Sequence, residues 1–185
     1  MSMDAAAELF ETDRLVATRI GPTDFDALCR LHRDPAVMRT LSADGNTYPD
    51  DVTRAGLEQA AEHWQRHGFG LWIFRDKAEG RFVGRGGLKH YDVAGRDEIG
   101  LAYAVISDHW GQGLATEIAA ASLGIGFDRL CVASIAAWTL PINARSLRVI
   151  EKLGMRREAD VVFAGLNHQF YRTTAEAWRS RSSGR

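Results

Sequence analysis

The order of the predicted elements changes between the two halves of this chain, and this change constrains the fold more than any other feature. Three strands separated by short turns are predicted first, at 70–75, 81–89 and 97–106. A helix, a strand and a second helix follow, at 113–127, 132–140 and 143–153. Short turns favour an antiparallel meander, whereas a strand–helix–strand order needs a crossover with parallel pairing. We therefore expect an α/β fold with a mixed, mostly antiparallel central sheet and helices on both faces.

The remaining segments are consistent with one domain spanning residues 1–185. Further strands are predicted at 14–19, 155–163 and 169–173, and further helices at 23–33, 35–41 and 50–67. No internal repeat or Pro/Ser-rich linker divides the sequence. The polar stretch RSRSSGR, residues 179–185, is expected to be a disordered tail.

The composition excludes two classes of partner. The 23 Lys and Arg residues are balanced by 24 Asp and Glu residues, so the chain lacks the excess positive charge that nucleic-acid binding requires. No stretch reaches the roughly 18 apolar residues of a spanning helix, and the N-terminal MSMDAAAELF lacks the basic start of a signal peptide. Cys29 and Cys131 lack a CxxC or Cys/His spacing, and we expect both to be buried. These features favour a cytoplasmic protein with no nucleic-acid or membrane partner.

The stretch WGQGLATE, residues 110–117, joins a predicted strand to a predicted helix. The first backbone N–H groups of a helix have no partner inside it, and their dipoles favour an anion. Glycines at 111 and 113 let an anion approach the backbone without a Cβ in the way. The stretch lacks the GK[ST] ending of a P-loop and the third glycine of a dinucleotide-binding loop. It therefore indicates a phosphate or pyrophosphate site, and a plain turn into a packed helix stays open as the alternative.

A second motif, NARSLRVIEKLGM at 143–155, places Asn143 and Ser146 in the first turn of a helix that follows a strand. WGQGLATE followed by this motif resembles the cofactor-binding segments of the GNAT superfamily of N-acetyltransferases. The resemblance is greatest to the RimJ/RimL-like branch of that superfamily. ETDRLVATRIGPTDFDAL and DPAVMRTL are similar to the N-terminal pattern of the branch, so the resemblance covers residues 11–173.

The resemblance implies acetyl-CoA as the cosubstrate and no metal. In the family, backbone N–H groups of the matching loop wrap the CoA pyrophosphate, and the loop residues here are Trp110, Gly111, Gln112, Gly113, Leu114, Ala115 and Thr116. Members often have Arg or Gln where this chain has Trp110. The resemblance also implies that the strand ending at Val105 and Ile106 splays from the next parallel strand and bonds the pantetheine arm. Asn143 matches a position that contacts the pantetheine or acetyl end, and Ser146 is expected beside it.

Attack of an amine on a thioester requires a base for the amine proton and an acid for the departing thiolate. We expect Glu98, acting through water, to be the base, because a period of two places it on one strand face with the small residues Gly100, Ala102 and Ala104. A solvated carboxylate at the strand end is the alternative for Glu98.

For the acid, many family members use a tyrosine at the position that Ile150 occupies here. Ser146 matches the serine proposed for this role in RimL-like enzymes, and a first-turn serine that satisfies backbone donors is the alternative. Substituting Gln for Glu98 or Ala for Ser146 is expected to lower kcat by about 10- to 10³-fold.

One further pair of residues is set aside. His63 and His67 stand four apart on a predicted helix, as metal ligands do, but the Glu of an HExxH motif is absent and no third ligand is evident. We expect no metal site.

The sequence as a whole predicts an acetyl-CoA-dependent N-acetyltransferase that acts on a primary amine by direct attack in a ternary complex. The N-terminal α-amine of a protein, as in ribosomal-protein acetylation, is the first choice on branch similarity alone. Amino acids, polyamines and aminoglycosides remain open, and so does a noncatalytic CoA-binding regulatory module. Nothing in the residues decides whether the chain forms a homodimer.

Overall fold

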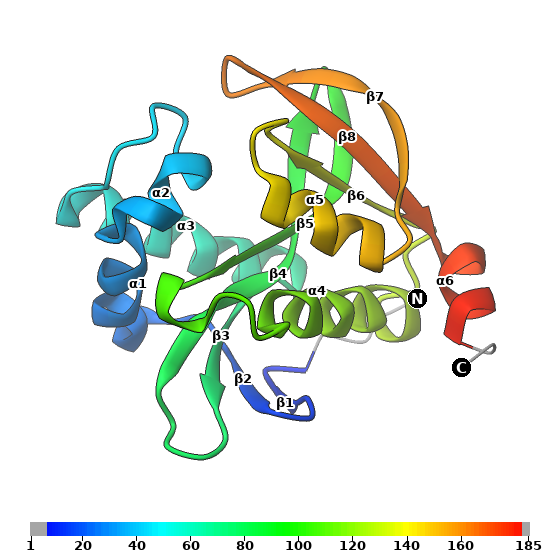
Figure 1. Cartoon of the computed structure of the whole chain (residues 1–185). Coiled ribbons are helices and arrows are strands. Elements are labelled where there is room, and N and C mark those ends of the chain that lie inside the picture. The colour runs from blue at the N-terminus through cyan, green and yellow to red at the C-terminus, as the bar shows by residue number, and fades with distance from the viewer. Residues whose placement is uncertain (1–6, 183–185) are drawn as a thin grey trace.

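The computed structural model describes residues 7–182, which form one α/β domain around an eight-stranded sheet (Figure 1). The strands are β1 (Leu9–Glu11), β2 (Leu15–Arg19), β3 (Leu71–Asp76), β4 (Phe82–Val93), β5 (Arg96–Val105), β6 (Ser134–Thr139), β7 (Arg156–Phe163) and β8 (Leu166–Thr174). The helices are α1 (Phe25–His32), α2 (Pro35–Leu41), α3 (Asp50–His67), α4 (Leu114–Gly124), α5 (Ala144–Lys152) and α6 (Ala175–Ser182). Short turns of helix occur at η1 (Pro22–Asp24), η2 (Ser107–His109) and η3 (Ile125–Arg129).

The strand order in the sheet is β1-β2-β3-β4-β5-β6-β8-β7. Every neighbouring pair is antiparallel except β5 and β6, which are parallel and joined through α4. The predicted meander is β3, β4 and β5, and the predicted crossover is β5–α4–β6. The expected mixed, mostly antiparallel sheet is thus confirmed.

Several predicted boundaries differ from the structure. β1 has no counterpart among the predicted strands, because only three residues of it are in the ladder. β4 continues past Lys89 to Val93, so that a hairpin with Ala94 and Gly95 at positive φ joins it to β5. The α-helix predicted to run to 127 becomes a π-helical turn at η3. Of the expected tail, 179–182 belong to α6, and 183–185 lie outside the described residues.

Helices lie on both faces of the sheet, as expected. α4 packs against β4 and β5, while α1 packs with α3, which runs behind the sheet in Figure 1. Contact with α4 is close at Gly86, where a Cβ would stand 2.3 Å from Cγ2 of Ile118. Since real Cβ atoms do not approach so closely, glycine at 86 is what lets α4 lie near the sheet.

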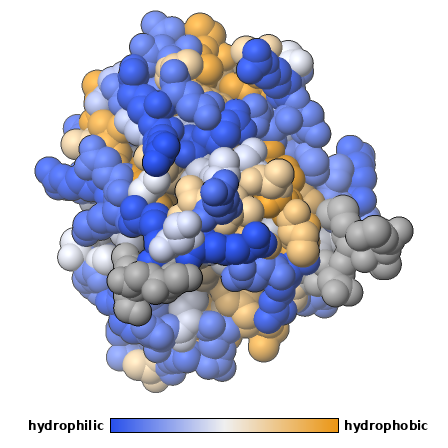
Figure 2. Space-filling model, turned by 90° about the vertical axis from the view of Figure 1, so that its right-hand side faces the viewer, coloured by the Kyte–Doolittle hydropathy of each residue, from blue (hydrophilic) through white to orange (hydrophobic). Residues whose placement is uncertain are grey.

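The core is filled by large apolar side chains from the central strands and the helices, among them Trp72, Phe74, Phe127 and Ile118. Burial of each such side chain stabilises the fold by roughly 1.5 to 3 kcal/mol. Cys29 is buried as expected, but Cys131 is exposed, because the chain turns there with a φ of 53° after η3. The face of the molecule in Figure 2 is mostly hydrophilic, with smaller hydrophobic areas between the hydrophilic residues. Within residues 7–182, no helix has the length and apolar character needed to cross a membrane.

Candidate active site

β5 and β6 separate soon after they pair. Their register consists of Gly100 opposite Ala136, and Val105 at the end of β5 has no partner on β6. A cavity of about 880 Å³ occupies this region and is lined by residues 101–105 of β5, 137–140 around the end of β6, and parts of α2, α4 and α5. Ile106 is buried and its N–H donates to Val83 O, so it lies behind the cavity wall. Main-chain groups near the end of β5 that have no partner on β6 are therefore available to a guest lying between the strands, except the Val105 carbonyl, which accepts from Trp110 Nε1.

The glycine pair shapes one end of this cavity. Gly111 and Gly113 both have a φ of 79°, in the left-handed region that favours glycine, and α4 begins at Leu114. No side chain caps α4, so the N–H groups of its first turn are free of side-chain acceptors. Nothing lies within 4 Å of a Cβ built on Gly111. Gly111, Gly113, Leu114, Ala115 and Thr116 all line the cavity, and this end has the form of an anion site.

An ion pair from the start of the chain fixes the glycine loop. The carboxylate of Glu117, in the first turn of α4, accepts hydrogen bonds from Arg14 Nε at 2.7 Å and from the Arg14 backbone N–H at 2.9 Å. Arg14 Nη1 donates to the carbonyl of Gln112 at 2.8 Å. Gln112 is not among the residues that line the cavity. The contact of Gln112 with the cofactor stays a prediction.

Trp110 contributes its ring to the cavity wall. Its Nε1 donates to Val105 O at 2.8 Å, and the guanidinium of Arg145 lies over its ring at 4.3 Å from the centroid. Trp110 thereby positions a cation near the glycine loop. The sequence analysis did not single out Arg145, although it lies inside the second motif.

The first turn of α5 brings the predicted residues Asn143 and Ser146 together with Tyr103, which was not predicted. Asn143 Oδ1 accepts from Ser146 N–H at 3.1 Å, so Asn143 is the helix cap. The hydroxyl of Ser146 is thus free for another partner, and it lies 2.8 Å from the hydroxyl of Tyr103 on β5. Burial raises the pKa of Tyr103 to about 12, and the phenol remains a proton donor at neutral pH. Tyr103 was missed, because a tyrosine in a strand gives no signal that a distant serine will meet it.

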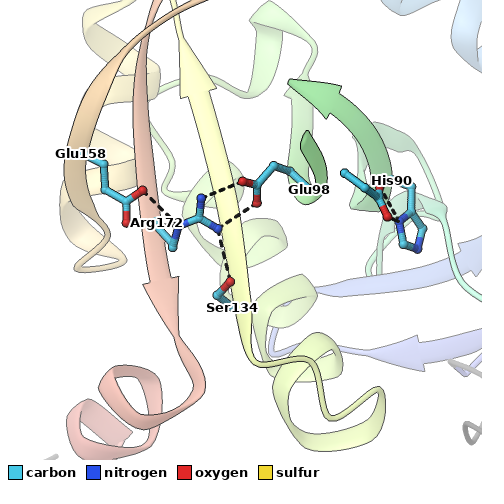
Figure 3. Close-up of polar contacts among 6 residues, drawn as sticks. His90, Glu98, Ser134, Glu158 and Arg172 are labelled. Atoms are coloured by element: carbon cyan, nitrogen blue, oxygen red, sulfur yellow. Dashed lines mark hydrogen bonds and ion pairs between the residues drawn. The ribbon is translucent and has the colours of Figure 1, made fainter. Parts of the chain in front are cut away.

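The structure does not bring Glu98 to this cavity. Its two carboxylate oxygens each accept a hydrogen bond of 2.8 Å from Arg172, which also contacts Glu158 and Ser134 (Figure 3). The hydrogen bonds from Arg172 lower the pKa of Glu98 below its ordinary value. Glu98 is absent from the cavity wall. The base role predicted for Glu98 therefore gains no geometric support. The pairing with Arg172 could not be predicted from the sequence, because the two residues are 74 positions apart.

The charges around the cavity have one sign. The cationic side chains in its wall are Arg39, Arg85, Arg145, Arg148 and Lys152, and two histidines, His109 and His168, join them. None of the described residues in the wall is Asp or Glu. The cavity therefore suits an anionic guest. These cations come from α2, β4 and α5, so no local pattern announces them.

The rings of His63 and His67 lie side by side on α3, with their centroids 4.5 Å apart. Nδ1 of His63 lies 2.9 Å from Phe69 O, and its Nε2 accepts from the N–H of His90 at 3.1 Å. Both ring nitrogens of His63 are therefore occupied. Among residues 7–182, no group of three or more His, Cys, Asp or Glu side chains is arranged to hold a metal ion.

Residues 14–156 match the Acetyltransferase (GNAT) domain family. The chain therefore belongs to the GNAT acetyltransferases, an enzyme family that uses acetyl-CoA. The protein YkkB of Bacillus subtilis (strain 168) is 37% identical over 125 residues, which are 68% of this chain and 71% of YkkB. The protein p20 of Bacillus licheniformis, named as an uncharacterized N-acetyltransferase, is 27% identical over 157 residues, 82% of this chain and 84% of p20.

Solved structures share the fold, including members of the branch that the sequence resembles. An acetyltransferase from Agrobacterium tumefaciens str. C58 superposes with a TM-score of 0.78 at 21% identity, over 94% of this chain and 98% of that one. RimL, named as ribosomal L7/L12 α-N-protein acetyltransferase in complex with coenzyme A, gives 0.76 at 13% identity over 92% and 99%. Mycobacterium smegmatis RimJ in complex with CoA-disulfide gives 0.73 at 20% identity over 97% and 96%.

Proposed function

We propose that this protein transfers the acetyl group of acetyl-CoA to a primary amine by direct attack in a ternary complex. The observation that carries the proposal is that one cavity runs from the uncapped start of α4 to the opening between β5 and β6 and on to the opposite side of the sheet. An acceptor that enters the cavity on the side lined by α2 and β4 can then reach a thioester held between the strands. A family relationship to acetyltransferases supports the same reading.

The cofactor end is assigned to the predicted loop and to α5. Backbone N–H groups from Gly111 to Thr116 would hold the pyrophosphate, and Arg145 beside Trp110 adds a cation within the same wall. Main-chain groups at the end of β5 would bond the pantetheine arm and polarise the acetyl carbonyl. Ile142, which is 73% exposed and lines the cavity, offers an apolar surface for that arm.

The thiolate leaving group needs a proton, and the Ser146 and Tyr103 hydroxyl pair is suited to supply it. Ser146 donates its proton to sulfur and takes one from Tyr103, bonded to it at 2.8 Å, and water then returns a proton to Tyr103. Because Asn143 caps α5, the Ser146 hydroxyl has no capping duty to compete with this role.

The amine must lose a proton, and we assign the base to His168 in place of Glu98. Nδ1 of His168 lies 3.0 Å from the carbonyl of Leu166, which can only accept, so Nδ1 carries the proton and Nε2 has a free lone pair. His168 lines the cavity. Substituting Asn for His168 keeps an N–H for Leu166 and removes the lone pair. We expect kcat to fall by about 10²- to 10⁴-fold with acetyl-CoA affinity unchanged, and an unchanged kcat would exclude this assignment.

The acceptor is proposed to be a primary amine at a protein N-terminus, in keeping with the name of RimL, which assigns that enzyme an α-amine of ribosomal L7/L12. A small-molecule amine is the second candidate. The cationic wall disfavours polyamines and aminoglycosides, since like charges repel at short range.

Turnover tests the proposal most simply. The protein is mixed with acetyl-CoA and a panel of peptides and amino acids, and free CoA and the acetylated product are measured by mass spectrometry. We expect equimolar release of CoA and formation of an N-acetyl product. Tight binding of acetyl-CoA without transfer to any amine would instead identify a noncatalytic CoA-binding module.

A further inference from the structure

We propose that the amine acceptor carries a carboxylate close to its amino group, and that Arg85 binds this carboxylate in the cavity. The inference deepens the proposed function and rests on it. It concerns the chemistry of the acceptor, about which the family relationship says nothing.

Arg85 lies in the middle of β4, paired with Ala104 on β5, and its side chain lines the cavity. The side chain is only partly accessible. Within residues 7–182, the guanidinium makes neither an ion pair nor a hydrogen bond, whereas those of Arg14, Arg75 and Arg172 each bond to a carboxylate. A guanidinium offers five N–H donors, and a ligand that enters the cavity can bond to them.

The titratable groups near Arg85 are phenols, a histidine and a lysine, and none of them is a carboxylate. Burial lowers the pKa of Arg85 below its ordinary value, and the nearby groups that act on it are the phenols of Tyr91 and Tyr48. Burial, and to a smaller extent the positive charge of Arg85, lowers the pKa of the neighbouring His32 and Lys89. No carboxylate of the described residues pairs with this group, which leaves it available to an anionic group of a ligand in the cavity.

The cofactor is an unsuitable source of that anion, because Arg85 lies on the other face of the sheet. Neighbouring residues in a strand point to opposite faces. Gly86 faces α4, where a Cβ would meet Ile118, and Tyr103, its partner on β5, meets Ser146 of α5. Arg85 therefore points toward the face covered by α1 and α3, away from the start of α4. Only a ligand on the acceptor side of the opening reaches it.

A carboxylate fits this group better than other anions of the acceptor. The planar guanidinium matches the two oxygens of a carboxylate in a bidentate pair, and such charge-assisted pairs are short and directional. A carboxylate held there fixes the amine near the thioester. Two sources supply this chemistry: the α-carboxylate of a free amino acid, or an acidic side chain next to the N-terminus of a peptide.

The experiment compares paired acceptors with the parent protein and with Arg85→Gln. One pair is alanine and alaninamide; the other is two amidated peptides that differ only in aspartate or asparagine at the second residue. For the parent, we expect kcat/KM to be about 10- to 100-fold higher for the carboxylate member of one pair. The pair that shows the preference identifies the source of the carboxylate.

Arg85→Gln should abolish the preference while the kcat/KM of the neutral member changes little. Arg148→Gln is the matched control, because Arg148 lines the cavity from α5. It should leave the preference for the carboxylate intact. The KM for acetyl-CoA should be unchanged in Arg85→Gln.

The outcomes separate the two proposals. Transfer by the parent to neutral and carboxylate acceptors with equal kcat/KM overturns this inference and leaves the acetyltransferase proposal standing, whereas no transfer to any amine defeats the proposed function itself. A loss in Arg85→Gln that is equal for both members of a pair, or a raised KM for acetyl-CoA, also overturns the inference. Should Arg85→Gln fail to fold, the preference of the parent still decides.

Discussion

Arg172 on β8 donates a hydrogen bond to each carboxylate oxygen of Glu98 on β5, and each bond is 2.8 Å long. β6 lies between these two strands, so the pair spans the strand at which the cavity opens. The side chains of Arg172 and Glu98 are 21% and 13% exposed, which places the pair largely out of water. The arrangement is that of a structural tie across the sheet.

Glu98→Gln should therefore lower stability more than turnover. Removing the charge leaves Arg172 with a weaker acceptor in a half-buried position, and we expect the free energy of unfolding to fall by about 1 to 3 kcal/mol. At temperatures where the variant is folded, kcat should stay within about threefold of the parent value. Urea denaturation and steady-state kinetics measure the two quantities.

Glu158→Gln is the control for this prediction. Glu158 contacts the same guanidinium but is 46% exposed, so its loss should cost less than about 1 kcal/mol. If Glu98→Gln instead lowered kcat by 10-fold or more with stability unchanged, the carboxylate would be the base expected from the sequence.

The hydroxyl pair at the start of α5 leads to a second prediction. Ser146→Ala should lower kcat by about 10- to 10³-fold with acetyl-CoA affinity nearly intact, because the thiolate then leaves without its proton. Tyr103→Phe should lower kcat less, and the double variant should lose less than the sum of the single losses, since the two groups act as a unit.

Ser134→Ala is the matched control, because the Ser134 hydroxyl bonds to Arg172 outside the cavity. Its kcat should equal that of the parent. Strictly additive losses at Ser146 and Tyr103 would contradict a shared proton path.

Stability should also fall at mildly acidic pH because of His32. His32 is 7% exposed, and burial, with a smaller effect of Arg85, lowers its pKa from 6.5 to about 4. Below pH 6.5 the unfolded chain takes up a proton at this histidine, whereas the folded chain does not until about pH 4. The stability present above pH 6.5 is thus lost as the pH falls toward 4, by up to about 3 kcal/mol from this residue.

Urea denaturation of His32→Gln and of the parent between pH 8 and 4.5 tests this effect. The variant should lose less stability than the parent below pH 6.5 and show the same slope as the parent between pH 8 and 7. Equal slopes below pH 6.5 would mean that protonating the buried imidazole of His32 does not lower the free energy of unfolding.

The fold was predictable from the sequence to a large extent, since strand periodicity, short turns and the strand–helix–strand order are local signals. The glycine loop and the start of α5 could be predicted for the same reason: Gly111, Gly113 and Asn143 sit at element ends, where residue type reports backbone geometry. The boundaries of β4 and α4 could not, because the hairpin at Ala94 and the π-helical turn depend on tertiary packing.

The side-chain partnerships of the site were not predictable. Tyr103 with Ser146, and Glu98 with Arg172, join residues separated by 43 and 74 positions, and a strand pattern gives the face of a residue but not its partner. The role proposed for Arg85 was not predictable either, because it depends on the absence of a partner among the described residues, and a strand pattern does not report this.

The most direct test is the affinity of acetyl-CoA for the parent, Gly111→Ala and Gly95→Ala, measured by calorimetric titration with ATP and NAD as further ligands. Both glycines have a φ near 78°, at 79° and 77°, and neither has an atom within 4 Å of a built Cβ, so the two substitutions impose equal backbone strain. Only Gly111 lines the cavity.

We predict that the parent binds one acetyl-CoA in preference to ATP and NAD, that Gly111→Ala weakens this binding by about 10-fold or more, and that Gly95→Ala leaves it unchanged. No binding to the parent at millimolar acetyl-CoA, or an equal loss in both variants, would mean that the glycine pair is only a turn into a packed helix.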